Sequence, residues 1–85
     1  MDQIPEAIRA FILTEFLPGE RPEDLLDDTP LITGGILDSL ATIKLVSFLE
    51  EQYGVAFQAY ETDVDHFNTV SDIASLVLAK LGRAK

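Results

Sequence analysis

Hydrophobic residues recur every three or four positions in three stretches of the chain, and this spacing places them on one side of an α-helix. The first stretch runs from Ile4 to Leu17, with charged residues on its opposite side. Asp2 is placed to cap its N-terminus, and the pair Pro18-Gly19 ends it. The positions that we expect to be buried are Ile4, Ile8, Phe11 and Ile12.

A second helix is predicted over Ser39–Tyr53. Gly54 follows it and supplies a stop, because glycine readily adopts the left-handed backbone that ends many helices. Asp38 precedes it, so we expect the Asp38 carboxylate to accept a hydrogen bond from the free backbone N–H of Leu40 or Ala41. The apolar residues at helical spacing, which we expect to share one face, are Leu40, Ile43, Val46, Leu49 and Tyr53.

The last helix has the clearest pattern. Thr69 and Asp72 resemble a capping box with Asp in place of Glu, and Gly82 ends the helix. The polar stretch between Tyr60 and Phe67 predicts at best a short third helix. The expected buried face of the last helix consists of Val70, Ile73, Val77 and Leu81.

Residues 18–37 keep no clear period and are interrupted by proline and glycine. A connection of about 20 residues is longer than most structureless loops. We therefore expect an ordered loop, with a short helical turn near residues 22–27, and an extended linker at residues 55–57. The prediction is an all-α four-helix bundle with three main helices, one short third helix and a long first loop, formed by residues 1–85 as a single domain.

Composition narrows the function. The 85 residues carry 6 Lys and Arg against 15 Asp and Glu, for a net charge of −9, and no cysteine. This charge repels nucleic-acid phosphates and anionic lipid heads and favours partners with basic surfaces. No signal-like or membrane-spanning apolar stretch is present, so we expect a cytoplasmic protein without membrane insertion. So short a chain is not expected to hold a large catalytic cleft.

The candidate site is the segment Gly34–Leu40, a loop that delivers the hydroxyl of Ser39 to the first turn of the second helix. The unpaired N–H groups and partial positive charge of a helix N-terminus stabilise an anion such as a phosphate ester. Gly34 and Gly35 allow a sharp turn and keep bulk away from the serine. Taken on their own, Asp38 and Ser39 are better explained by ordinary helix capping.

The wider context favours the first interpretation. Residues 35–40, residues 42–54 and the segment Phe67–Val70 together resemble the acyl carrier protein superfamily over nearly the whole chain. Members of that superfamily accept 4′-phosphopantetheine on the serine of an Asp-Ser-Leu or Asp-Ser-Met motif. The resemblance implies that Ser39 carries this group covalently. It also implies that Asp38 helps a phosphopantetheinyl transferase to hold Mg²⁺, beside its role as N-cap.

Details of the sequence bear on the subfamily. Fatty-acid carriers often have acidic residues two and five positions after the serine, where this chain has Ala41 and Lys44. Residues 61–69 resemble free-standing carriers more closely, such as the D-alanyl carrier protein and carriers of small acyl or aminoacyl units in secondary metabolism. A fatty-acid carrier remains the alternative within the superfamily.

The resemblance implies that the chain is not an enzyme but a monomeric carrier that holds its cargo as a thioester. Its expected partners are a phosphopantetheinyl transferase, an acyl- or aminoacyl-activating ligase, and a downstream transferase or synthase. Expected docking residues follow the serine on the second helix, although core packing or a solvated face also explains them. They are Leu40, Ile43, Lys44, Glu50 and Glu51. Thr42, Val46 and Leu49 would line a space for cargo or belong to the core.

Other functions fit less well. A serine hydrolase needs a base, and His66 is the only histidine, in a polar stretch without a Gly-x-Ser-x-Gly motif. A calcium loop that begins at Asp63 would need Gly at its sixth position and Glu at its twelfth, where Asn68 and Ala74 stand. We therefore expect no metal site. The rival from another class is an acidic helical interaction module that carries no prosthetic group.

Overall fold

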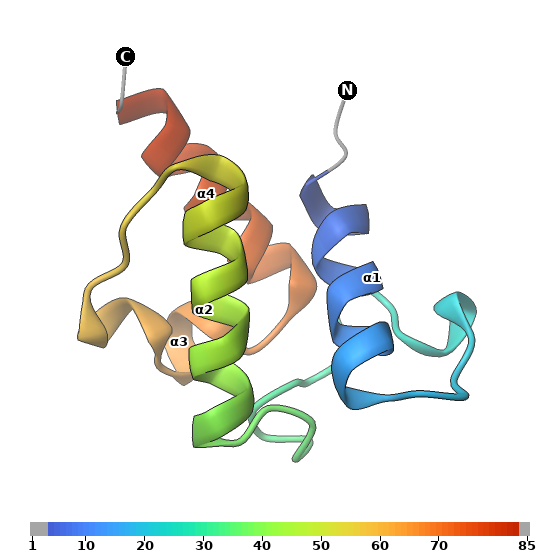
Figure 1. The fold of residues 1–85 in the computed structure, drawn as a ribbon. Helices are drawn as coiled ribbons and strands as arrows, with labels where there is room; N and C mark the ends of the chain where they lie inside the picture. The colour runs from blue at the N-terminus through green and yellow to red at the C-terminus, as the bar shows by residue number, and fades with distance from the viewer. Residues whose placement is uncertain (1–3, 84–85) are drawn as a thin grey trace.

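The computed structural model of the protein describes residues 4–83; Asp2, the expected N-cap of the first helix, lies outside this range. Four α-helices and two 3₁₀ turns account for its regular structure (Figure 1), and residues 4–83 contain no strand. The all-α prediction with three long helices and one short one is confirmed. The elements are α1 (Ile4–Phe16), η1 (Pro22–Asp24), α2 (Ser39–Tyr53), η2 (Ala59–Thr62), α3 (Val64–Phe67) and α4 (Val70–Arg83).

The three long helices pack on one another. Figure 1 shows α1 and α2 side by side and running in opposite directions, with α4 behind them, and α1 contacts both other long helices. The short helix α3 packs against α4 and against η2. The start of α2 therefore lies near the long first loop and opposite the η2–α3 segment, while α1 and α4 cover its inner face.

The core comes from all of these elements. Leu25 and Leu31 of the long loop are as completely buried as the residues of the helices. Each fully buried aliphatic or aromatic side chain contributes about 1.5–3 kcal/mol relative to its exposed state. The fully buried residues of the helices are Ile8 and Ile12 of α1, Leu45 and Leu49 of α2, Phe67 of α3, and Val70, Ile73 and Val77 of α4.

The apolar residues at helical spacing on α2 are not all buried. Leu40 and Ile43 are each 62% exposed, and the buried residues are Ala41, Leu45 and Leu49. Apolar residues occur on more than one side of α2, so two overlapping stripes satisfy the helical period. Packing against α1 and α4 buries the stripe with a spacing of four residues and leaves Leu40 and Ile43 open to solvent, whereas Val46 and Tyr53 pack partly against the core.

The long loop is ordered because its polar backbone is bonded to distant residues. The side chain of Asn68, at the α3–α4 junction, accepts hydrogen bonds from the backbone N–H groups of Ile32 (2.9 Å) and Thr33 (3.0 Å). Nε of Arg9 donates to the carbonyl of Leu25 at 2.9 Å, and its guanidinium also pairs with Asp27. The predicted turn in residues 22–27 is η1. Residues 55–57 form an irregular linker, as expected.

Candidate functional site

The loop before α2 is folded around one buried carbonyl group. The backbone N–H groups of Ile36 and Leu37 both donate to the carbonyl of Leu31, at 2.8 and 2.9 Å. Gly35 has a φ of +83°, which favours glycine, and a Cβ on Gly34 would lie 2.2 Å from the carbonyl oxygen of Pro30. The glycine pair thus serves the tight turn that the sequence predicted, and it fixes where α2 begins.

Asp38 caps α2 as predicted. Its backbone is extended, and its Oδ1 accepts a hydrogen bond from the N–H of Ala41 at 2.8 Å. Ser39 is then the first residue of the helix, and its side chain is exposed. The serine hydroxyl therefore stands at the positive end of a four-turn helix, where a phosphate ester is favoured.

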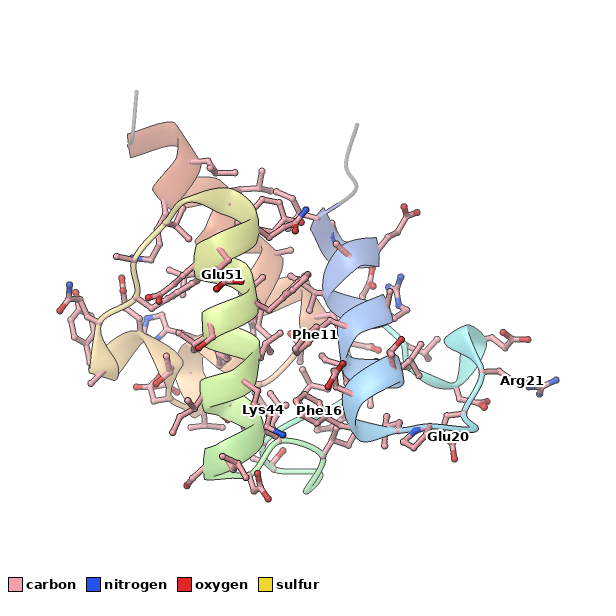
Figure 2. All side chains as sticks on the ribbon, in the orientation of Figure 1. Phe11, Phe16, Glu20, Arg21, Lys44 and Glu51 are labelled. Atoms are coloured by element: carbon pink, nitrogen blue, oxygen red, sulfur yellow. The ribbon has the colours of Figure 1, made fainter. Side chains whose placement is uncertain are left out.

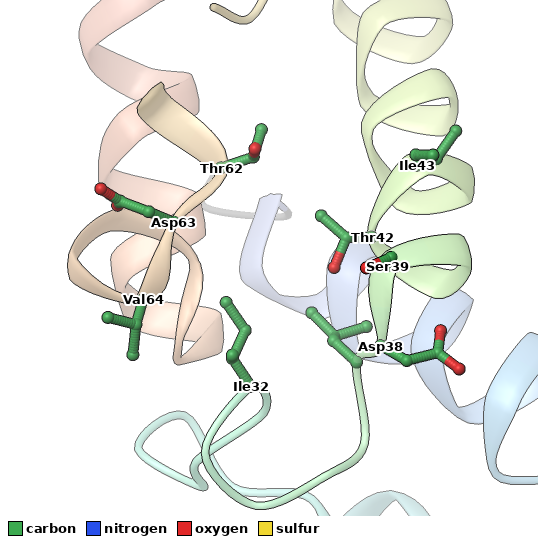
Figure 3. Close-up of a pocket in the computed structure, with 9 residues that line it drawn as sticks. Ile32, Asp38, Ser39, Thr42, Ile43, Thr62, Asp63 and Val64 are labelled. Atoms are coloured by element: carbon green, nitrogen blue, oxygen red, sulfur yellow. The ribbon is translucent and has the colours of Figure 1, made fainter. Parts of the chain in front are cut away.

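An open groove of about 520 Å³ begins at Ser39. Figure 3 shows the groove between the start of α2, which presents Thr42 and Ile43, and the facing segment of η2 and α3. The lining is mainly apolar, with hydroxyl and carboxylate groups interspersed. The complete lining consists of Ile32, Leu37, Asp38, Ser39, Thr42, Ile43, Thr62, Asp63 and Val64. Such a groove suits an extended chain with few polar groups better than a highly charged ligand.

The far wall of the groove carries a small polar unit. Oδ1 of Asp63 caps α3 by accepting from the backbone N–H of His66, and it also contacts Nδ1 of the His66 ring at 2.8 Å. This side-chain hydrogen bond raises the pKa of His66 above its ordinary value of 6.5 and lowers the pKa of Asp63 below 3.8. His66 thus bonds to Asp63, and it is not among the residues that line the groove with Ser39.

The structure separates the expected docking residues into two groups. Leu40 and Ile43 are exposed beside Ser39, and Lys44 and Glu51 are exposed farther along α2. Glu50 is half-buried, and its Oε2 accepts a hydrogen bond from the backbone N–H of Phe57 at 3.0 Å, so its carboxylate holds the linker after α2. Docking by these residues stays a prediction.

Lys44 lies on the side of α2 that faces α1. Figure 2 shows Lys44 and Phe16 next to the space between the two helices, and both line a hollow of about 310 Å³ together with Leu40. The other fully described Lys and Arg side chains each have an acidic partner, whereas Lys44 has none among the described residues. This arrangement keeps a positive charge available near Ser39 in an otherwise acidic protein.

Sequence reasoning missed most of the groove. Of the three residues proposed to line a cargo space, Thr42 lines the groove, whereas Leu49 is completely buried in the core and Val46 packs against it. The polar character of residues 61–69 did not show that Thr62 and Val64 would face α2. Their position depends on how α3 packs on α4, which no local pattern reports.

Two searches among residues 4–83 complete the description. No group of three or more His, Asp or Glu side chains is arranged to hold a metal ion there. Within the same residues, no helix is long and apolar enough to cross a membrane.

Two known carrier proteins are similar in sequence to this chain. The probable acyl carrier protein PigG of Serratia sp. (strain ATCC 39006) is 38% identical over 66 residues, which cover 78% of this chain and 75% of PigG. The D-alanyl carrier protein of Leuconostoc mesenteroides subsp. mesenteroides is 30% identical over 81 residues, 95% of either chain. No protein-family model matches the chain.

A solved structure has a chain with a similar fold. One chain of a structure described as "Crystal structure of FAD-dependent dehydrogenase" superimposes with a TM-score of 0.75 at 37% sequence identity. The match covers 82% of this chain, about 70 of its 85 residues, and 97% of that chain.

The two relatives define the class of this helical bundle as that of the carrier proteins. The chain belongs to the family that includes the acyl and D-alanyl carrier proteins. Proteins of this class hold a cargo and present it to other enzymes. The fatty-acid alternative and the plain interaction module are not favoured by the relatives.

Proposed function

We propose that the protein is a free-standing carrier that holds a small acyl or aminoacyl unit as a thioester on a 4′-phosphopantetheine arm attached to Ser39. The observation that carries the proposal is the placement of Ser39. Its exposed hydroxyl is the first helical position after the Asp38 cap, in a chain whose relatives are carrier proteins. On this proposal the protein itself catalyses nothing, and partner enzymes perform the chemistry.

The residues at the site fit the arm. The free N–H groups at the start of α2 would face a phosphate on Ser39, and the mainly apolar groove next to it would accept the extended part of the arm. The group supplies a terminal thiol, and the chain has no cysteine of its own. Figure 3 shows the Asp38 carboxylate on the side of α2 away from the facing segment. It is therefore accessible to an Mg²⁺ ion held by a transferase, since hard carboxylate oxygens suit that ion.

Attachment is tested by mass. The purified protein is incubated with coenzyme A, Mg²⁺ and a promiscuous phosphopantetheinyl transferase, and its intact mass is recorded. We expect a gain of one phosphopantetheine group in the wild type and no gain in Ser39→Ala, which should remain folded by circular dichroism. A folded wild-type protein that gains nothing would show that this is an interaction module without a prosthetic group. Modification of Ser39→Ala would show that the attachment site lies elsewhere.

We propose that the cargo is a small acyl or aminoacyl unit rather than a fatty acid. Ala41 and Lys44 occupy the positions where fatty-acid carriers often have acids, and one of the two relatives named above is a D-alanyl carrier protein. The partners would be a ligase that activates the unit and a transferase or synthase that accepts it. The mass of the loaded protein isolated from its host identifies the cargo, and a long-chain fatty acyl group would contradict the proposal.

The solved structure suggests one further partner class. The structure that holds the similar chain is described as an FAD-dependent dehydrogenase, and the match spans nearly all of that chain in about 70 residues, the size of a carrier domain. We infer that a flavin-dependent dehydrogenase acts on the unit tethered to Ser39. Two hydrogens would pass from the cargo to FAD, and molecular oxygen would reoxidise the flavin. Loaded protein incubated in air with dehydrogenases from the same genome should lose the mass of two hydrogens; an unchanged mass with all of them would refute the inference.

A further inference from the structure

We propose that the ion pair between Glu61 and Lys80 positions the far wall of the groove, and thereby sets how well the groove shelters a thioester carried on Ser39. The part that concerns the thioester rests on the proposed function; the part that concerns the wall does not. Neither residue lines the groove or reaches Ser39, so both are positioning residues.

The ion pair is largely buried and its contact is short. Nζ of Lys80 lies 2.7 Å from Oε1 of Glu61, and the two side chains are only 11% and 7% exposed. The same Oε1 accepts a hydrogen bond from the backbone N–H of Gln58 at 2.8 Å. Nζ of Lys80 also lies 5.2 Å from the centre of the Phe57 ring. One carboxylate therefore ties the start of η2 to α4.

The groove wall follows directly in the chain. Thr62, Asp63 and Val64 come immediately after Glu61, and all three line the groove opposite Ser39 (Figure 3). The 3₁₀ turn η2 packs against α3, and α3 packs against α4. The Glu61–Lys80 pair adds a direct side-chain link from η2 to α4, at the point where the chain enters the wall.

The two walls of the groove are held by different forces. The α2 wall is fixed by the buried residues Ala41, Leu45 and Leu49, which do not depend on η2. The facing wall is anchored by the fully buried Phe67 and, in addition, by a charge pair whose attraction is strong only while both partners are present. Removal of Lys80 takes away the cation that lies 2.7 Å from the Glu61 carboxylate, and the loss of one partner of a buried pair is far costlier than the removal of both. The carboxylate will then move toward water and take the wall with it.

Hydrogen exchange on the unmodified protein tests the wall. In Lys80→Met, we expect exchange of the backbone amides of Glu61, His66 and Phe67 to accelerate at least about tenfold relative to the core amide of Leu49. Arg9→Met is the matched control, because it removes the ion pair with Asp27 on the loop instead. There the same ratio should change by less than about twofold. An unchanged ratio in Lys80→Met would overturn the proposal whether or not Ser39 carries an arm.

Hydrolysis of a loaded thioester tests the consequence for the cargo. Octanoyl-coenzyme A and the promiscuous transferase supply the loaded protein. In the hydrolysis, water adds to the thioester carbonyl, the C–S bond breaks, octanoate leaves, and the thiol stays on the arm. We expect hydrolysis in Lys80→Met to be at least about threefold faster than in the wild type, with the rate of loading on Ser39 changed by less than about twofold. Equal hydrolysis rates would overturn the sheltering role.

The double variant Glu61→Gln with Lys80→Met separates position from stability. It removes both charges of the pair together, so its melting temperature should lie closer to the wild-type value than that of Lys80→Met. Its octanoyl thioester should still hydrolyse faster than that of the wild type, because the link between η2 and α4 is absent. If both quantities return to wild-type values, the pair contributes only stability and the proposal fails. If the wild type cannot be loaded at all, the proposed function fails. The hydrogen-exchange measurement then still decides whether the ion pair positions the wall.

Discussion

The side chain of Asn68 holds the backbone of Ile32, although 36 positions separate the two residues in the chain. The Oδ1 atom accepts from the N–H of Ile32 at 2.9 Å and from that of Thr33 at 3.0 Å, while the carbonyl of Asn68 accepts from Leu31 at 2.6 Å. Nδ2 of Asn68 also donates to the hydroxyl of Thr33 at 3.3 Å. The α3–α4 junction thereby fixes the loop that leads to Ser39.

Replacement of Asn68 by Ala should lower the free energy of unfolding by about 1–3 kcal/mol, because the part-buried backbone N–H of Ile32 and the exposed N–H of Thr33 lose their acceptor. Denaturant unfolding at equilibrium measures this loss. Asn68→Asp is the matched control, since it keeps the acceptor oxygen and loses only the donation to Thr33, so it should cost less. Equal losses in the two variants would show that the acceptor is not the important group.

Gly34 should not tolerate a larger side chain. A Cβ at this position would lie 2.2 Å from the carbonyl oxygen of Pro30, and backbone atoms on both sides of this contact would have to move. Gly34→Ala should therefore destabilise the protein by about 1–3 kcal/mol, as strained backbone substitutions do. Gly82→Ala is the control, because a Cβ there meets nothing within 4 Å. Thermal unfolding should show a clear loss for the first variant and none for the second.

Asp38 combines a structural and a functional role that two substitutions can separate. Asp38→Asn keeps a side-chain oxygen for the N–H of Ala41 and should leave stability within about 0.5 kcal/mol of the wild type. Asp38→Ala removes the cap and should cost about 1 kcal/mol. Both variants lack the carboxylate proposed to assist Mg²⁺, so both should be loaded more slowly at Ser39. Normal loading of Asp38→Asn in the mass assay would show that Asp38 serves only as the helix cap.

The sequence was sufficient for the elements and the attachment loop, because those depend on local rules. Helix period, the Asp38 cap and the Gly54 stop are readable within a few residues of one another, and the structure contains each of them. For Leu40 and Ile43 the sequence left both exposure and core packing open. Two stripes on α2 satisfied the same period, and only the packing of α1 and α4 decides between them.

Long-range polar contacts could not be predicted from the sequence. The acceptor role of Asn68 joins segments far apart in the chain, and the pairing of Glu61 with Lys80 joins η2 to α4. No spacing rule connects such residues, since the distance between them depends on the whole fold. The groove could not be predicted for the same reason, because these contacts position its far wall. From the sequence alone, an acidic residue such as Glu61 is expected to be exposed to solvent, because nothing near it in the chain indicates its partner Lys80.

The contact between Asp63 and His66 makes the stability of α3 depend on pH. The raised pKa of His66 means that its contribution is fully present below pH 6.5 and is lost as the pH rises through the raised value. The lowered pKa of Asp63 means that its contribution is present above pH 3.8 and is lost as the pH falls through the lowered value. The contributions of His66 and Asp63 are therefore both present between pH 3.8 and pH 6.5.

An NMR titration of the His66 ring checks this pair. The midpoint should lie above 6.5 in the wild type and should fall in Asp63→Asn, which removes the charge but keeps an N-cap for α3. The exchange protection of the Phe67 amide, which is bonded to the carbonyl of Asp63, should weaken as the pH rises past the wild-type midpoint, after correction for the intrinsic rate. An equal midpoint in the two proteins would show that the hydrogen bond does not persist in solution.

The exposed stripe of α2 should matter for loading and not for folding. Leu40 is 62% exposed and directly follows Ser39, whereas Leu45 is fully buried one turn farther along. Leu40→Ala should therefore change the free energy of unfolding by no more than about 0.5 kcal/mol. Leu45→Ala should cost about 2–5 kcal/mol, because it leaves a cavity in the core.

A partner that reaches Ser39 must cover Leu40, and an apolar anchor at the centre of an interface often carries much of the binding energy. We therefore expect Leu40→Ala to slow loading by the transferase severalfold at unchanged stability. Leu78→Ala removes an exposed leucine from α4 instead and should change neither quantity. If Leu40→Ala loads at the wild-type rate and Leu78→Ala does not, then the partner approaches Ser39 over α4, and the docking face predicted on α2 is wrong.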